Sequence, residues 1–106
     1  MKTKLPQDDA RYSWTHHSFN KMRQYGISES RIKRIIRYPK RIEEGIAENT
    51  VAVMQPGGTT RYQEIWVMYV VRGKRLRVIT TWRYPGKSPE RDPIPQDILR
   101  EVEKLL

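Results

Sequence analysis

Hydrophobic and polar positions divide the chain into helical segments and a set of strands. The clearest pattern runs from residue 61 to 84, where two stretches rich in Val, Ile, Thr, Tyr and Trp are separated by Arg72, Gly73 and Lys74. Because glycine supplies the positive φ that a tight turn needs, this region is predicted to be a β-hairpin. The side chains of its first arm are apolar on both faces, so we expect this arm to be a central strand.

The second arm of this hairpin alternates between an apolar and a basic side. The apolar side holds Leu76, Val78, Thr80, Trp82 and Tyr84, and the other side holds Arg75, Arg77, Ile79, Thr81 and Arg83. We expect the apolar side to pack on helices and the three guanidinium groups to share the opposite side.

Two short helices with well-marked ends precede the strands. Thr15 is a candidate N-cap for a helix over residues 16–25, and Gly26 is in the position that ends it. Ser28 caps a second helix, which Pro39 ends. The short break between them predicts a helical hairpin.

The remaining segments complete the predicted domain. Residues 40–46 and 50–55 are strand candidates, which with the β-hairpin would form an antiparallel sheet of about four strands. Residues 85–95 hold four prolines and are predicted to be an irregular connector. Residues 96–106 carry an apolar stripe at helical spacing, which predicts a final helix.

The order of these elements predicts an α+β domain over residues 11–106. An N-terminal helical hairpin would pack on a small antiparallel β-sheet, a C-terminal helix would follow, and the helices would lie on one face of the sheet. Residues 1–10 are polar and are predicted to be a flexible tail.

Charge is the most informative part of the composition. The chain has 21 Lys and Arg against 12 Asp and Glu, a net charge of +9. Residues 11–41 contain nine bases and one acid, and residues 61–91 contain eight bases and two acids. Such concentration is typical of a protein that binds a phosphate backbone, although a solvated basic surface gives the same pattern.

Other functional classes are excluded or made less favourable by the sequence. The absence of cysteine excludes disulfides and thiolate chemistry. The longest apolar run, residues 65–71, is far shorter than the roughly 20 residues of a membrane span, and residues 1–7 lack the apolar core of a signal peptide. We therefore expect a cytoplasmic protein. Neighbouring His16 and His17 diverge by about 100° on a helix and no spaced carboxylate cluster joins them, so we expect no metal or other cofactor.

Residues 17–28, HSFNKMRQYGIS, resemble the signature H-A-x-x-R-M-x-x-R-G-I-S of the family called domain of unknown function 4258. That family is similar to a branch of the RelE/ParE-type toxin superfamily. The matching residues are His17, Met22, Gly26, Ile27 and Ser28. Lys21 replaces the first arginine with another cation, whereas Tyr25 replaces the second arginine and removes a charge. The resemblance extends more loosely to about residues 12–84.

This resemblance implies a toxin-type RNA-binding domain that pairs with an acidic antitoxin. It also raises the hypothesis of a metal-independent ribonuclease acting on messenger RNA at the ribosome. Such cleavage needs a base for the 2′-hydroxyl, cations for the phosphate and a donor to the leaving oxygen. The catalytic candidates are His17, Arg83, Tyr84 and Arg61, with Tyr62 as an alternative proton carrier. The candidates for RNA binding are Arg75, Arg77, Arg34, Arg37, Lys87 and Trp82.

Each candidate also has a purely structural interpretation. Arg75 and Arg77 could simply keep a strand face soluble, and His17 could be a first-turn residue that bonds backbone or a neighbouring strand. Trp82 could stack on bases but is more often a core residue, as are Trp14 and Trp66. We expect Trp66 to be buried and Trp82 to be partly buried.

Two alternative functions use the same residues. One is a nucleic-acid-binding module without catalysis, whose affinity would fall steeply with salt. The other is a module that binds an acidic, antitoxin-like peptide through its basic surface or its last helix.

Overall fold

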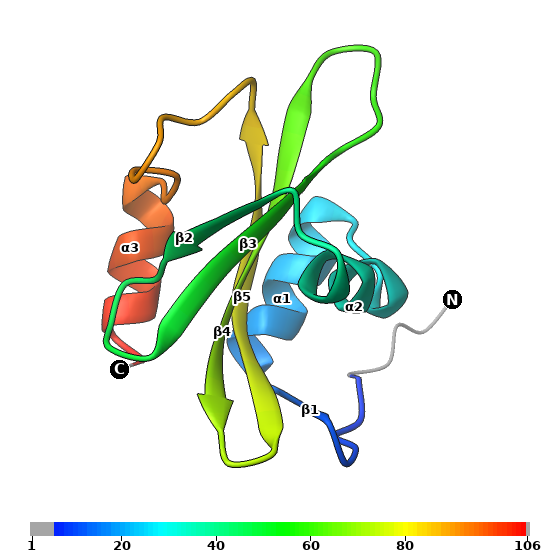
Figure 1. The fold of residues 1–106 in the computed structure, drawn as a ribbon, viewed down its shortest axis with the longest axis vertical. Helices are drawn as coiled ribbons and strands as arrows, with labels where there is room; N and C mark the ends of the chain where they lie inside the picture. The colour runs from blue at the N-terminus through cyan, green and yellow to red at the C-terminus, as the bar shows by residue number, and fades with distance from the viewer. Residues whose placement is uncertain (1–5, 106) are drawn as a thin grey trace.

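A single β-sheet of five strands forms the centre of the α+β domain in the computed structural model, which describes residues 6–105 (Figure 1). In chain order the elements are β1 (Tyr12–Trp14), α1 (His16–Tyr25), α2 (Glu29–Arg37), β2 (Arg41–Glu44), β3 (Thr50–Pro56), β4 (Gln63–Arg72), β5 (Arg75–Pro85) and α3 (Gln96–Glu103). None of the helices in the described range is long and apolar enough to cross a membrane.

The sheet order is β1-β5-β4-β3-β2, and β4 lies near its centre as its two apolar faces predicted. The predicted sheet of about four antiparallel strands is wrong in two respects, because the sheet has five strands and is mixed. Tyr12–Trp14 forms the additional strand and runs parallel to β5. A segment of three residues has no measurable alternation, so its pairing with a distant strand could not be read from its own sequence.

Capping residues define α1 and α2 as predicted. The Thr15 hydroxyl accepts a hydrogen bond from the Ser18 amide at 3.0 Å, and Gly26 has the left-handed conformation, with φ of 65°, that ends α1. The Ser28 hydroxyl accepts from the Arg31 amide at 3.1 Å and begins α2. These local signals need no tertiary contact, which explains why the sequence predicted both helices correctly.

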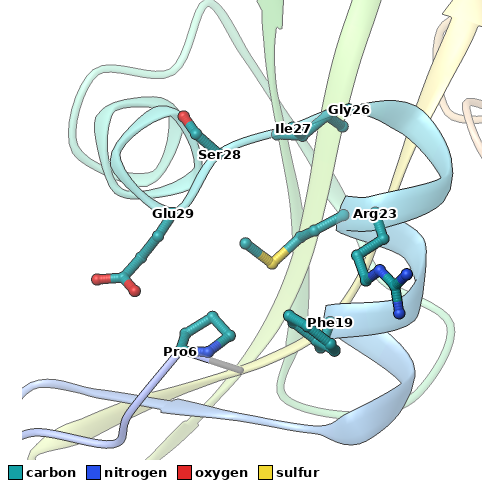
Figure 2. A pocket seen from close by; sticks show the side chains of 8 residues that line it. Pro6, Phe19, Arg23, Gly26, Ile27, Ser28 and Glu29 are labelled. Atoms are coloured by element: carbon teal, nitrogen blue, oxygen red, sulfur yellow. The ribbon is translucent and has the colours of Figure 1, made fainter. Parts of the chain in front are cut away.

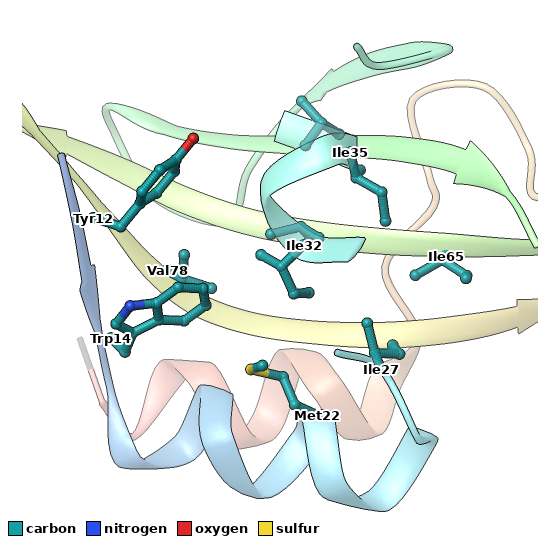
Figure 3. Packing of buried hydrophobic residues seen from close by; sticks show 10 residues of the cluster. Tyr12, Trp14, Met22, Ile27, Ile32, Ile35, Ile65 and Val78 are labelled. Atoms are coloured by element: carbon teal, nitrogen blue, oxygen red, sulfur yellow. The ribbon is translucent and has the colours of Figure 1, made fainter. Parts of the chain in front are cut away.

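The helices cover both faces of the sheet, so the prediction that they share one face is wrong. On one face α1 and α2 bury the hairpin-side core, seen in Figure 3, which consists of Tyr12, Trp14, Met22, Ile27, Ile32, Ile35, Val53, Ile65, Val67 and Val78. On the other face α3 buries the α3-side core, which consists of Ala52, Met54, Trp66, Met68, Ile79, Trp82, Ile98 and Val102. Because β4 is apolar on both faces, each face requires a cover.

A β-bulge in β5 changes which side chains share a face. Met68 pairs with Thr80 and Tyr69 pairs with Val78, so Ile79 is an extra residue without a partner on β4. Side chains after the bulge therefore point to the face opposite to the one that simple alternation predicts. Val78 belongs to the hairpin-side core, whereas Ile79 and Trp82 belong to the α3-side core.

Thr15 binds the backbone of β5 at this bulge. Its amide donates to the Val78 carbonyl at 3.2 Å, and its hydroxyl donates to the Ile79 carbonyl at 3.0 Å. The N-cap of α1 thus satisfies carbonyls at the point where pairing between β1 and β5 ends. One residue positions both the start of α1 and the irregularity in β5.

Two predicted irregular segments are attached to the sheet by hydrogen bonds. Within the described part of the predicted tail, residues 6–10, the Asp9 carboxylate accepts from the Arg11 and Tyr12 amides at 2.8 and 2.7 Å. The predicted connector has no helix or strand between Pro85 and α3, as expected. The Pro93 carbonyl accepts from the Trp82 indole at 3.2 Å, which holds the connector against the α3-side core.

Candidate functional site

A cavity of about 800 Å³ lies where β1 ends and α1 begins, and we call it the His17 cavity. Its walls come from the first turn of α1, the turn before β3, and facing parts of β4 and β5, with Leu105 beyond α3. Its charged and titratable lining residues are Asp8, His16, His17, Glu48, Arg72 and Arg77. The fold therefore brings together two predicted site residues, His17 and Arg77, that are distant in the sequence.

His17 is held on one side of its ring by β5 and α3. Its Nε2 atom lies 3.1 Å from Thr80 Oγ1 and 3.5 Å from Glu101 Oε2. Lys21 neutralises Glu101, with Nζ 2.9 and 2.8 Å from the two carboxylate oxygens. A carboxylate beside Nε2 favours the tautomer that is protonated there, and this leaves Nδ1 as the nitrogen able to accept a proton.

The surroundings of His17 favour the neutral imidazole. Burial lowers its pKa below the usual value of 6.5, the nearby Glu101 carboxylate raises it, and the Lys21 ammonium lowers it; the net pKa is lowered. A neutral histidine at pH near 7 can act as a general base.

This lowered pKa predicts that His17 makes stability depend on pH. Below about pH 6.5 His17 of the unfolded chain binds a proton, whereas His17 of the folded protein stays neutral down to its lower pKa. The free energy of unfolding should therefore fall as the pH drops from about 6.5 toward the folded pKa. The His17 contribution is at most about 1.4 kcal/mol per pH unit. Urea unfolding at about pH 7.5 and 5.5 should show a larger loss for wild type than for His17→Gln. Equal losses in the two proteins would contradict the assignment.

Arg77 is the cation in the His17 cavity that the sequence had singled out. No salt bridge joins it, or Arg72, to a carboxylate among residues 6–105. Asp8 and Glu48 also line the cavity, and the Asp8 carboxylate accepts from the Trp14 amide at 3.0 Å. The lining is thus mixed in charge, with both guanidinium groups left available to an anion.

Arg83 lies outside this cavity, so the prediction that Arg77 and Arg83 share a surface is wrong. Arg83 Nε donates to the Tyr25 carbonyl at the end of α1 at 2.8 Å, and Nη1 lies 3.5 Å from Gln63 Oε1. His17 stands in the first turn of the same helix, about 12 Å away along its axis. The bulge at Ile79 separates Arg83 from Arg77, because it turns Arg83 to the face of the sheet that α1 and α2 cover.

Trp82 is buried completely, although we expected it to be partly exposed and able to stack on bases. Its ring stacks on Trp66 with 5.9 Å between centroids and 6° between planes, and Trp66 is buried as predicted. Trp82 therefore belongs to the core and is removed from the RNA-binding candidates.

The other predicted site residues are scattered over the surface. Tyr84 is half-buried against the α3-side core. Arg61 is exposed in the loop before β4, Arg75 at the hairpin turn and Lys87 in the connector. Arg34 and Arg37 are exposed on α2. None of these side chains lines the His17 cavity.

A buried carboxylate in the central strand, Glu64, was not among the predicted site residues. Glu64 is completely buried, and its Oε1 accepts from Trp66 Nε1 at 3.0 Å and from Ser88 Oγ and N at 2.5 and 3.2 Å. Its Oε2 lies 3.2 Å from the Tyr62 hydroxyl and 3.4 Å from Arg41 Nη1. We call these five residues the Glu64 network. An acid inside a strand predicted to be buried on both faces was the available signal.

Arg41 extends the Glu64 network to the connector. It donates to the Ser88 and Pro89 carbonyls at 3.1 and 3.2 Å, and its guanidinium lies 5.0 Å from the centroid of Trp66. Arg41 also forms a salt bridge with Glu43 at 2.8 Å. These contacts all lie within the protein, so we assign the network a structural role.

A second cavity, of about 410 Å³, lies between α1 and α2 (Figure 2). Phe19, Met22 and Ile27 form its apolar part, and Arg23 and Glu29 are its charged members. None of the predicted catalytic or RNA-binding residues lines it.

No group of three or more His, Cys, Asp or Glu residues in the described range is arranged to hold a metal ion. Comparison of the chain with family models, with curated proteins and with solved structures found no match.

Proposed function

We propose that this protein is a toxin-type RNA-binding domain whose His17 cavity cleaves a phosphodiester without a metal ion. The observation that carries the proposal is the meeting of a base and a cation in one cavity. His17 has a lowered pKa and an available Nδ1, and Arg77 has no salt bridge within the described chain.

The proposed reaction is transfer of the phosphoryl group to the neighbouring ribose hydroxyl. His17 Nδ1 takes the proton of the 2′-hydroxyl, and the 2′-oxygen bonds to phosphorus. Arg77 and Arg72 hold the charge of the phosphate oxygens as the bond to the 5′-oxygen breaks. His16, exposed on the cavity wall, supplies the proton to the leaving oxygen. The products are a 2′,3′-cyclic phosphate and a 5′-hydroxyl.

The resemblance to the domain of unknown function 4258 signature supports this proposal through His17, which matches the signature, and Lys21, which keeps the charge of its first arginine. Met22 and Ile27 lie in the core and Gly26 ends α1, so these matches have structural reasons. His17 and Lys21 instead contribute to the polar system with Glu101. By the same resemblance, the proposed substrate is messenger RNA at the ribosome and the proposed partner is an acidic antitoxin.

Arg77→Ala is the variant that tests this function. Wild type should cleave single-stranded RNA equally with and without a chelator and should leave a 2′,3′-cyclic phosphate. Loss of Arg77 should lower the cleavage rate by about 10²-fold or more, because phosphate charge then develops without its main cation. Arg100→Ala is the matched control, an exposed arginine on α3 that should change little.

The alternatives give different results in the same assay. Binding of RNA without cleavage would select the non-catalytic nucleic-acid-binding module. If Arg77→Ala and Arg100→Ala change the cleavage rate equally, the His17 cavity is not the site of cleavage.

A further inference from the structure

A second group of cationic side chains, from α2 and β5, lies outside the His17 cavity. Arg31 Nη2 donates to the Pro56 carbonyl at 2.7 Å. Arg83 reaches the same loop, because a Cβ atom added to Gly57 would lie 3.8 Å from Arg83 Nη1. Arg34 follows Arg31 by three residues on the same side of the helix. We call Arg31, Arg34 and Arg83 the arginine cluster.

The arginine cluster lacks an anionic partner within the described chain. No salt bridge to a carboxylate is formed by any of the three in residues 6–105. Arg31 Nε is buried and has no hydrogen-bond partner in that range. Burial lowers the pKa of Arg31, and the charges of Arg34 and Arg83 lower it further. Like charges held this close favour an external anion.

An exposed aromatic residue follows the last residue of α2 as its C-cap. Tyr38 is 66% exposed, and its backbone amide donates to the Arg34 carbonyl at 2.9 Å. Gln55 Nε2 donates to the Arg34 and Tyr38 carbonyls at 3.3 and 2.8 Å, which holds this end of the helix on β3. The backbone of Tyr38 is therefore held next to Arg34, and its ring is exposed to solvent.

We propose that the arginine cluster and Tyr38 form a second RNA-binding surface, which holds single-stranded RNA by its phosphates and by stacking of a base. The combination is the reason for preferring RNA to an acidic protein segment. A purely acidic segment would use only the guanidinium groups, whereas single-stranded RNA uses the guanidinium groups for its phosphates and the exposed ring for a base. The inference rests on the proposed function only in its choice of RNA.

This surface is separate from the His17 cavity. Arg83 binds the last turn of α1, and His17 occupies the first turn, about 12 Å away along the helix. Since the bulge turns Arg83 and Arg77 to opposite faces of the sheet, one small ligand cannot contact both. The surface would therefore raise affinity for longer strands without taking part in cleavage.

The test measures binding of a labelled, 2′-O-methylated single strand of about 12 nucleotides, which cannot be cleaved, to the full chain. Affinity is measured by fluorescence anisotropy at several salt concentrations for wild type, Arg34→Ala, Tyr38→Ala, Tyr38→Phe and Arg100→Ala. Thermal unfolding verifies that each variant is folded, as expected for exposed positions.

Each variant has its own expected result. Arg34→Ala should weaken binding and lower the slope of log affinity against log salt by about 0.7, the loss of one phosphate contact. Tyr38→Ala should weaken binding about fivefold or more with an unchanged slope, because stacking releases no counterions. Tyr38→Phe should keep most of the affinity, and Arg100→Ala should match wild type.

Other outcomes overturn the inference. These are equal effects of Arg34→Ala and Arg100→Ala, or no effect of Tyr38→Ala. If polyglutamate displaces the probe as effectively as unlabelled RNA of equal charge does, the surface binds an acidic protein segment instead. If wild type binds as expected but cleaves nothing, this surface stands and the catalytic proposal fails.

Discussion

Replacing Glu64 by alanine should lower the free energy of unfolding by about 3–5 kcal/mol, the usual cost of breaking a buried ion pair. Removing the carboxylate leaves the Trp66 indole, the Ser88 hydroxyl and the Arg41 guanidinium without their shared acceptor. It also removes the hydrogen bonds by which the Ser88 hydroxyl and amide hold the connector to Glu64. Urea or guanidinium unfolding followed by circular dichroism measures the loss.

Two further variants make this prediction specific. Glu44→Ala, an exposed glutamate on the edge strand β2, should change stability by no more than about 0.5 kcal/mol. Tyr62→Phe removes a single donor to Glu64 and should cost about 1 kcal/mol. A Glu64→Ala protein as stable as Glu44→Ala would mean that the network contributes nothing net to folding.

The ionisation of Glu64 agrees with this role. Burial raises its pKa, but hydrogen bonds from Ser88, Trp66 and Tyr62 lower it by more, so the net pKa falls below the usual 4.5. A carboxyl group with a lowered folded pKa stabilises the protein above its unfolded pKa. That contribution disappears as the pH falls from about 4.5 through the folded value.

Replacing His17 by alanine should lower the rate of RNA cleavage by about 10²- to 10⁴-fold, the range for loss of a general base. The non-cleavable probe should bind with nearly wild-type affinity, because the phosphate-binding arginines remain. In wild type the rate should rise with pH through a value below 6.5, the folded pKa of His17, and this acidic limb should be absent from His17→Ala. If His17→Ala keeps a residual cleavage rate with the same acidic limb, the general base is a group other than His17.

Glu101→Gln separates a positioning role from a purely structural one. The Glu101 carboxylate raises the pKa of His17, so its removal should move the acidic limb to lower pH. The unpaired Lys21 ammonium would shift it in the same direction. A lower rate with an unmoved limb would indicate that Glu101 only supports the fold.

The bulge at Ile79 explains why the predicted site residues separated. Simple alternation along β5 predicts Arg77 and Arg83 on one side, and the strand follows that alternation as far as Val78. The extra residue then reverses the phase, so Arg83 binds the end of α1 while Arg77 lines the His17 cavity. A β-branched residue within a strand carries no local signal of a bulge, because the bulge depends on the partner strand and on Thr15.

The sequence by itself determined the elements whose causes are local. Thr15, Gly26 and Ser28 set the ends of the two helices, since caps satisfy backbone groups within a few residues. The β-rich pattern and the turn at Gly73 in residues 61–84 determined the β-hairpin, and the two apolar faces of its first arm determined the central position of β4. Tertiary structure alone decided the parallel pairing of β1, the placement of α3 on the opposite face, the burial of Trp82 and the meeting of His17 with Thr80, Arg77 and Glu101. Those outcomes depend on contacts between segments far apart in the chain, which local patterns of polarity do not encode.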